Sequence, residues 1–467
     1  LIGFWYEKKS AYNAAIKAFT TTRVADVIML LGIAYLFMMT GTLNFRDIMY
    51  NPAPVEGETA VIAEGETAAV EGEAAVVESE AAPAEGEAAA AEGEHAAEGE
   101  AHADTWAIRL AETPAILFGG ISAAGLIGIF LIIGTVGKSA QFPLHVWLPD
   151  AMEGPTPVSA MIHAAAMVSA GIYAIIRMYP LFEAGGHPHH GEFTAPLLFM
   201  AVVGAFTALF AATIAVAQND VKKVLAYSTI SQLGFMMAAL GIGGFIPAAF
   251  HLITHAFFKA LLFMASGAVI HGMEHGEHHV HAHGHGHGHE LDSGHAPPAL
   301  AAGHGGGGAD AAFAAHDHGG HAIAAHGDHA IEHHEEHAHS EEHAHAFDPQ
   351  DMMNMGGLRK TMPVTFITFL IGGLSLAGLP LITAGFWSKD EILAEAWLGL
   401  TEGFGPHALV FIMLALAAFL TAFYTARQLS LTFLGEARTE EAKHANLGRG
   451  VVSFTMTLPL IILAFFA

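Results

Sequence analysis

The sequence predicts an all-α polytopic membrane protein with about nine transmembrane spans. Hydrophobic residues make up 53% of the 467 residues and charged residues only 13%, against roughly 25% charged residues in soluble globular domains. Apolar runs of roughly 20 residues, the length that crosses a hydrocarbon core of about 30 Å, recur along the chain. The Lys and Arg residues between these runs gather in alternate loops, as expected for a membrane protein of fixed orientation.

The apolar runs set the order of the predicted helices. They fall at residues 24–43, 113–137, 157–182, 195–217, 221–242, 246–271, 362–386, 408–433 and 451–467. With alternating spans, the basic segments 8–23, 222–223, 359–360 and 438–449 all lie on one face of the membrane. We expect that face to be cytoplasmic, because cytoplasmic loops carry the excess of Lys and Arg.

Two low-complexity segments divide the apolar chain. Residues 1–53 form a loop and the first span, residues 105–273 carry five spans, and residues 351–467 carry the last ones. Residues 54–104 hold 15 acidic residues and no Lys or Arg, and their many Gly residues predict a disordered or weakly helical outer loop. The second segment, 274–350, lies on the inner side and holds 13 acidic residues and no Lys or Arg. The net charge of −27 therefore belongs mainly to these two segments.

The second segment is rich in histidine. It contains 21 of the 33 histidines of the chain. Imidazole binds zinc, nickel and copper, but nothing in this segment sets a coordination geometry. We expect opportunistic metal binding and no fixed metal site, with a metal-storage or metal-sensing membrane protein as one alternative reading.

The composition also limits cofactors and partners. The chain has no cysteine, which excludes disulfides and cysteine-ligated iron–sulfur clusters. It shows neither a Gly-rich nucleotide loop nor a haem-binding pattern, so we expect no redox cofactor in this chain and no nucleic-acid partner. Both ends fall within apolar runs, which suggests that the sequence is truncated.

Several ionisable residues lie inside the predicted spans. A charged side chain at the centre of a membrane helix costs roughly 2.5–3.5 kcal/mol on insertion scales, so such residues are functional candidates. His251, His255 and Lys259 recur at four-residue spacing and share a stripe about 12 Å long on one helix face. Neutral histidine can pass protons near pH 7, and this stripe predicts a proton relay. Lys138 follows an apolar stretch and is either a proton carrier or a side chain that reaches the inner face.

Other polar groups extend this set. His163 begins the third span and is expected to face the segment around Lys138. Arg23 and Asp26 are one helical turn apart and can pair at the cytoplasmic end, or simply anchor the helix. Gly and Pro residues at 378–385 interrupt the seventh run just before Lys389 and Asp390. A broken helix with charges at depth is a recurrent feature of transporters.

Several motifs of the sequence resemble those of a known family of membrane proteins. The motifs are long and cover nearly everything outside the two low-complexity segments. They are GKSAQFPL (137–144), WLPDAM (147–152), GPTPVSA (154–160), IHAA (162–165), VLAYSTISQLG (224–234), the stripe 251–259, MGGLRK (355–360) and GFWSKDEIL (385–393). They are similar to those of the largest antiporter-like membrane subunit of respiratory complex I, or NADH:quinone oxidoreductase, known as subunit L.

The resemblance implies a fold and a mechanism. Members have two inverted repeats of five helices around broken helices, with a hydrated polar axis along the membrane midplane. They translocate protons while quinone is reduced in other subunits, which carry the flavin, the iron–sulfur clusters and the quinone. The implied partners are other membrane-arm subunits, especially the neighbouring antiporter-like subunit, and the lipid bilayer. The implied location is the bacterial cytoplasmic (inner) membrane, with multiple passes.

The resemblance also assigns residues. Lys138 and His163 match the first half-channel, and Lys389 matches the second. His251, His255 and Lys259 match the family residues that connect the two half-channels. Supporting polar residues of the family are matched by Arg23, Asp26, Lys222 and Asp390.

The given sequence differs from the family pattern in three ways. The glutamate that pairs with the first half-channel lysine in the family would precede Leu1, the family's long lateral helix beyond the last spans is missing, and the two low-complexity segments are atypical. The large subunit of a multisubunit sodium/proton antiporter shares the same axis and is the main alternative reading.

Overall fold

The computed structural model describes residues 1–51, 53, 105–116, 120–284, 347–448 and 451–467. These residues form α-helices joined by turns and short 3-10 segments, and the only extended pairing among them consists of two isolated bridges. The chain divides into two units, Leu1–Val280 with Asp348–Ala467, and His281–Phe347. The acidic segment 54–104 and residues 285–346 of the His-rich segment lie outside the described residues, and the expectations for them stay predictions.

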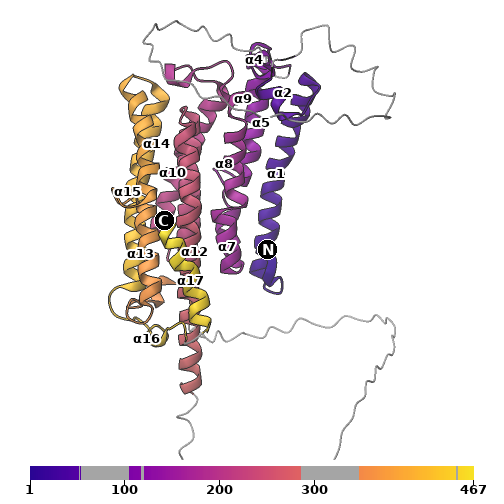
Figure 1. Cartoon of the computed structure of the whole chain (residues 1–467). Helices are drawn as coiled ribbons and strands as arrows, with labels where there is room; N and C mark the ends of the chain where they lie inside the picture. Colours follow the sequence, from indigo (N-terminus) through magenta and orange to yellow (C-terminus); the bar gives the residue numbers. More distant parts are fainter. Residues whose placement is uncertain (52, 54–104, 117–119, 285–346, 449–450) are drawn as a thin grey trace, which may run out of the picture. The chain divides into compact units, whose positions relative to one another are not determined.

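Helices α1 (Lys9–Thr40) and α5 (Ala123–Lys138) pack along one another (Figure 1). Small residues allow this approach: a Cβ on Gly137 would overlap Ala25, and one on Gly134 would overlap Met29. Such contacts through small residues are typical of membrane helices. Close packing of α1 on α5 brings the middle of α1 to the carboxyl end of α5.

The third apolar run is a broken helix. Its two halves are α7 (Thr156–Ala164) and α8 (Met167–Arg177), separated by non-helical backbone at Ala165 and Ala166. Short helices α6 (Trp147–Asp150) and η2 (Ala151–Glu153) precede it, and α9 (Tyr179–Glu183) follows it. The run predicted at 157–182 is therefore a discontinuous span.

Helices α10 (Ala195–Ala217) and α11 (Val221–Gly241) form a tight antiparallel pair. A Cβ on Gly204 would overlap the backbone of Ala238, and one on Gly241 would overlap Ala201. Nearly all of α11 is buried inside the protein. Its polar residues therefore face other helices, where they can find hydrogen-bond partners that lipid would not provide.

Helix α12 (Phe245–Gly284) extends well beyond residue 273, where the sequence analysis placed the start of the His-rich segment. The extension is held by α16 (Glu440–His444): the ring of His279 stacks on that of His444 at 4.4 Å, and Gly276 lies against the backbone of Glu441. Tertiary contacts of this kind override the weak helix preference of histidine and glycine.

The second broken span occurs where the Gly and Pro residues predicted it. Helix α13 (Pro363–Ala377) ends at Gly378, whose φ of +80° is left-handed, and α14 (Ala384–Thr401) begins after the interruption. Helices α15 (Gly405–Phe433) and α17 (Val451–Phe466) complete the described spans.

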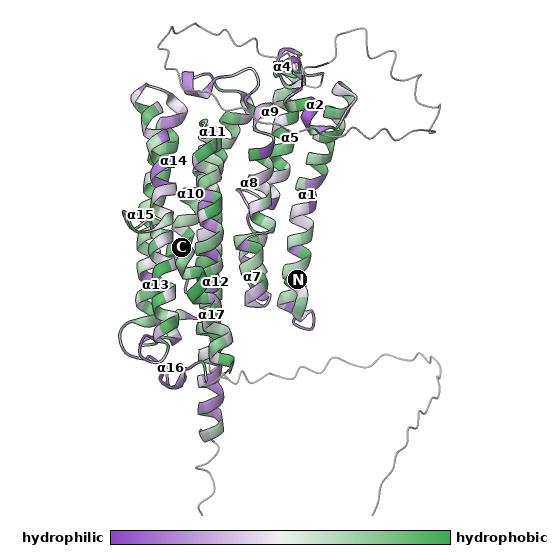
Figure 2. Cartoon of the chain, viewed as in Figure 1, coloured by the Kyte–Doolittle hydropathy of each residue, from purple (hydrophilic) through white to green (hydrophobic). Residues whose placement is uncertain are grey.

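The helices confirm a multi-pass membrane protein. Among the described residues, six helical segments are long and apolar enough to cross a membrane, namely Lys9–Thr40, Thr156–Arg177, Ala195–Ala217, Val221–Gly241, Phe245–Ala282 and Gly405–Phe433. Three shorter apolar helices, α5, α13 and α17, account for the remaining predicted runs. Apolar residues cover much of these helices, whereas hydrophilic residues gather near several of their ends and on the tip of α12 (Figure 2).

The basic loops gather at one end of the helices, as the predicted sidedness requires. Lys17 Nζ lies 2.6 Å from Asp150 Oδ2, and Arg438 Nη1 donates to the Met352 carbonyl oxygen at 3.0 Å. The short helices α2 (Phe45–Met49), α4 (Trp106–Glu112) and α9 lie at the other end, together with the 3-10 turn η3 (Pro188–His190) (Figure 1). Which compartment each end faces stays a prediction.

Candidate functional site

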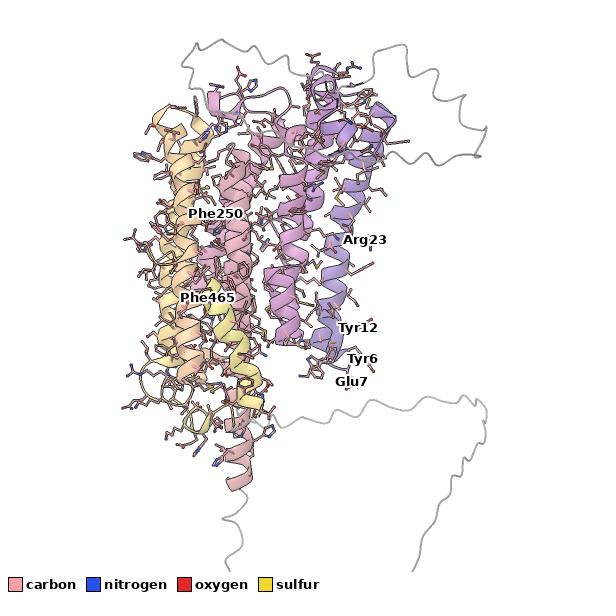
Figure 3. All side chains as sticks on the ribbon, in the orientation of Figure 1. Tyr6, Glu7, Tyr12, Arg23, Phe250 and Phe465 are labelled. Carbon is pink, nitrogen blue, oxygen red and sulfur yellow. The ribbon has the colours of Figure 1, made fainter. Side chains whose placement is uncertain are left out.

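The site begins at an ion pair between α5 and α1. Lys138 Nζ lies 2.9 Å from Asp26 Oδ1, and both side chains are partly buried. Arg23 is a minor partner, with its Nη1 3.8 Å from Asp26 Oδ2 and its side chain on the outer face of α1 (Figure 3).

The position predicted for Arg23 and Asp26 was wrong. Because α1 begins at Lys9 and not at residue 24, both residues lie within the helix and not at its basic end. The polar residues before the first apolar run continue the same helix, which the hydropathy pattern alone did not show.

His163 lies directly before the break between α7 and α8. Its ring is fully buried and stacks on that of Phe263 from α12, with the centroids 4.5 Å apart. The sequence analysis placed it opposite the segment around Lys138. That segment instead contacts α8, where Ser139 Oγ donates to the Val168 carbonyl oxygen at 2.8 Å. Neither ring nitrogen of His163 has a hydrogen-bond partner among the described residues.

Lys259 is the most enclosed of the lysines. Its side chain is fully buried, and Nζ donates to Ser228 Oγ and, at 3.3 Å, to the Leu225 carbonyl oxygen. Both partners lie on α11. The hydrogen-bond partners of Lys259 among the described residues are thus a hydroxyl and a carbonyl oxygen, and neither is a carboxylate.

His255 and His251 continue from Lys259 along α12. Their rings lie 6.3 Å apart, and both are fully buried. His251 is held at both nitrogens: Nδ1 lies 2.8 Å from Ser388 Oγ and Nε2 lies 3.1 Å from Gln232 Oε1. Neither nitrogen of His255 has a hydrogen-bond partner among the described residues, and the residue lies between His251 and Lys259 on one face of α12.

Lys389 lies at the second helix break. Its Nζ donates to the carbonyl oxygen of Leu376, in the last turn of α13, and lies over the ring of Phe235 at 5.7 Å. Carbonyl groups at the end of a helix lack an intrahelical partner. Gly385 makes the geometry achievable, because a Cβ there would overlap the Ser375 carbonyl oxygen. The broken helix therefore supplies the acceptor for the buried lysine.

Three polar residues complete the row and were not singled out as site residues by the sequence analysis. Ser228 contacts Lys259, Gln232 contacts His251, and Ser388 links His251 to α14. Ser228 and Gln232 are four residues apart on α11 and so share one face. The sequence shows Ser228 and Gln232 as polar residues four positions apart within an apolar run. Only the packing of the helices shows that Ser228 contacts Lys259 and that Gln232 contacts His251.

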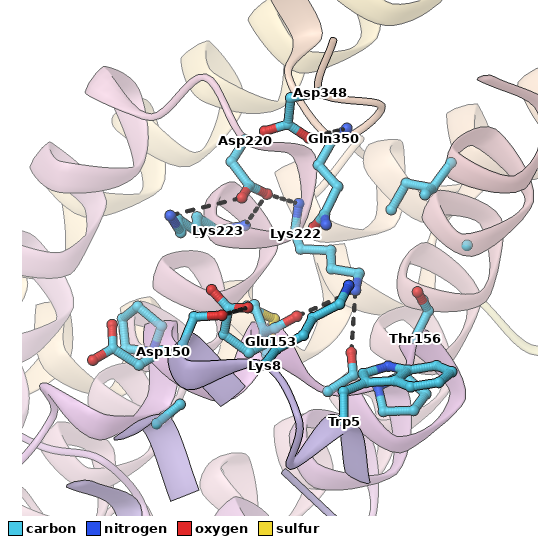
Figure 4. A pocket seen from close by; sticks show the side chains of 18 of the residues that line it. Trp5, Lys8, Asp150, Glu153, Thr156, Asp220, Lys222, Lys223, Asp348 and Gln350 are labelled. Atoms are coloured by element: carbon cyan, nitrogen blue, oxygen red, sulfur yellow. Dashed lines mark hydrogen bonds and ion pairs between the residues drawn. The ribbon is translucent and has the colours of Figure 1, made fainter. Parts of the chain in front are cut away.

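Two of the predicted supporting residues, Lys222 and Asp390, lie away from the buried lysine–histidine row. Lys222 Nζ donates to the carbonyl oxygens of Met152 and Gly154, each at 3.2 Å, beside a cavity of about 680 Å³ at the basic end (Figure 4). Asp220 caps α11 by accepting from the backbone of Lys222, and burial raises the pKa of its carboxyl group. Asp390 is exposed on α14, on a different face from the buried Lys389.

The row can carry protons but shows no metal site. Within residues 1–51, 53, 105–116, 120–284, 347–448 and 451–467, no three His, Cys, Asp or Glu side chains are placed to hold a metal ion. Buried lysines and histidines linked by hydroxyl and amide groups can instead take up and release protons in sequence.

These features define a class, a polytopic membrane protein whose broken helices enclose a buried lysine–histidine row. The family model described as "NADH:quinone oxidoreductase/Mrp antiporter, TM" matches residues 1–65, 116–284 and 337–421. The chain therefore belongs to this family, and the resemblance inferred from its motifs is confirmed.

Individual relatives agree with this assignment. The chain is 38% identical over 461 residues to the NAD(P)H-quinone oxidoreductase chain 5 of Synechocystis, covering 98% of this chain and 46% of the relative. It is 35% identical to NADH-quinone oxidoreductase subunit L of Rhodobacter capsulatus, covering 99% and 46%. The chain thus spans about half the length of the curated relatives it matches.

A solved structure shows the same fold. The structure of the Mrp complex from Dietzia aligns with 97% of this chain and 34% of the solved chain, with a TM-score of 0.57 and 23% sequence identity. This likeness supports the antiporter-like arrangement of broken helices.

Proposed function

We propose that the chain is a proton-translocating membrane-arm subunit of an NADH:quinone oxidoreductase. The observation that carries the proposal is the buried stripe of Lys259, His255 and His251 on α12, whose His251 end bonds to Ser388, one residue before Lys389. The Lys138–Asp26 pair forms a second, partly accessible group at the α1–α5 contact. Protons move along this row when charge changes elsewhere in the complex alter the protonation of the lysines.

The proposal includes partners and a location. Flavin, iron–sulfur clusters and quinone belong to other subunits, and this chain contributes no redox centre. Its partners are other membrane-arm subunits, foremost the neighbouring antiporter-like subunit, in the bacterial cytoplasmic (inner) membrane. The relatives named as subunits of quinone oxidoreductases support this assignment.

Lysine substitutions test the proposed function. In the complete complex, Lys259→Ala and Lys389→Ala should each lower NADH-driven proton pumping at least about tenfold, because each removes a proton-carrying group that water cannot replace in an apolar site. Pumping is measured in vesicles with a pH-sensitive dye, and assembly by co-purification of the other subunits. Lys9→Ala, an exposed lysine at the start of α1, is the matched control.

Full pumping in both lysine variants would exclude the row as the proton path. The second candidate, the large subunit of a sodium/proton antiporter, is favoured by the family description, which names both kinds of protein, and by the fold likeness to the Mrp structure. Co-purification of flavin and iron–sulfur subunits with this chain supports the oxidoreductase, and their absence together with sodium-dependent proton exchange supports the antiporter.

A further inference from the structure

A second cavity lies at the end opposite the basic loops. It has a volume of about 490 Å³, enough for on the order of ten water molecules. It is lined by residues 243–247, which form the turn before α12 and the first residues of that helix, and by several groups that can carry a proton. These are Tyr50, Tyr179, Glu183, His189, Glu391 and Glu395.

An imidazole–carboxylate pair lies at the centre of these groups. His189 Nδ1 is 3.2 Å from Glu395 Oε1, and the side chains are 58% and 24% exposed. His189 also packs against Gly243, in the turn before α12. The pair therefore joins the loop after α9 to α14 and to the start of α12.

Other titratable groups surround the pair. Burial raises the pKa of Glu183, and His189 and His187 oppose this rise. His407 of α15 lies within electrostatic reach of His189, and Tyr179 lies within reach of Glu395 and Glu183. The Tyr179 hydroxyl is already engaged, since it donates to the Leu240 carbonyl oxygen at 3.1 Å.

Helix α14 connects this cavity to the buried row. Ser388, Glu391 and Glu395 follow one another at spacings of three and four residues, so they share one face over about 10 Å. Ser388 contacts His251 at the inner end of this stripe, and Glu395 contacts His189 at the outer end. Helix α12 also runs from the cavity to the buried row, because its first turn lines the cavity and His251 follows less than two turns later.

We propose that this cavity is where the buried row exchanges protons with water at the end away from the basic loops, with His189 and Glu395 as the last carriers. This inference rests on the proposed function. A proton that reaches the Glu395 carboxylate passes to His189 Nδ1, and the imidazole releases one from Nε2 to water. The pair then has its starting charge and the imidazole its other tautomer, which proton exchange with water resets before the next proton arrives; no electron is transferred.

The experiment uses the complete complex in vesicles, with the pH of the compartment facing the cavity varied separately. Glu395→Gln and His189→Gln keep a hydrogen-bonding group but should lower the rate of NADH-driven proton transfer about tenfold. They should also abolish its dependence on the pH of that compartment. Glu192→Gln is the control, because Glu192 is an exposed acid in the same loop outside the cavity.

The outcomes separate the two proposals. If Lys389→Ala stops pumping but both cavity variants match Glu192→Gln in rate and pH profile, the exchange site is wrong and the proposed function stands. If Lys259→Ala and Lys389→Ala both pump normally, the buried row is not the proton path and the proposed function itself is wrong. Should Glu395→Gln fail to assemble, His189→Gln decides the question alone, because its side chain is mostly exposed in a loop.

Discussion

At the scale of single residues, the chain uses two different environments for its lysines. Lys138 has a carboxylate partner and partial exposure, whereas Lys259 and Lys389 are buried against hydroxyl and carbonyl oxygens. Lys138 therefore has a fixed counter-ion, whereas the described hydrogen-bond partners of Lys259 and Lys389 are uncharged oxygens.

The Lys138–Asp26 pair can be tested separately. Asp26→Asn removes the charged partner of Lys138 and should slow pumping about fivefold, the equivalent of roughly 1 kcal/mol for a partly exposed ion pair. Initial pumping rates in vesicles measure the effect. Asp47→Asn, which changes an exposed carboxylate on α2, should behave like the unmodified protein. An equal loss of pumping rate in both variants would show that the total number of negative charges matters and not the Lys138–Asp26 ion pair.

At the scale of helices, the breaks before α8 and before α14 place different residues of the site. The break before α8 lies beside His163, and the break before α14 offers the Leu376 carbonyl oxygen to Lys389. In lipid, an unpaired backbone group is costly, so a helix is interrupted only where protein or water can satisfy the freed groups. The second break was predicted from Gly and Pro residues. The first was implied only by the family resemblance, because Ala165 and Ala166 carry no local signal.

Gly385 should be required for the second break. Gly385→Ala places a Cβ into the Ser375 carbonyl oxygen, and overpacking of this kind destabilises by about 1–3 kcal/mol. We expect a lower thermal midpoint and reduced pumping, because α14 must shift and carry Lys389 with it. Gly405→Ala is the control, since a Cβ there meets open space. Equal thermal midpoints for the two variants would contradict this account of the break.

At the scale of the whole molecule, none of the proposed proton carriers belongs to the two low-complexity segments. The two ends of the His-rich segment nevertheless belong to the described structure: the Gln350 carbonyl oxygen accepts from the backbone of Val221, and α12 continues to Gly284. The buried row lies within the unit formed by Leu1–Val280 and Asp348–Ala467.

Deletion of residues 285–346 should therefore leave NADH-driven pumping within about twofold of normal, because none of the proposed proton carriers lies there. The same deletion should remove most nickel or zinc binding, measured by retention on a metal-affinity resin. A deletion of 274–350 is expected to be more damaging, because it also removes the end of α12 and its contact with α16. Loss of pumping with the shorter deletion would give the His-rich segment a direct role.

The sequence by itself determined that this chain crosses the membrane many times, that its basic loops share one face, and that lysines and histidines lie within the spans. These properties depend on local hydropathy, charge and helical spacing, which a single sequence contains. Only the tertiary structure decided that Asp26 pairs with Lys138, that His163 stacks on Phe263, and that Ser388 joins α14 to His251. The partner of a buried polar group depends on which helices pack together, and that choice is made by contacts between residues far apart in the chain.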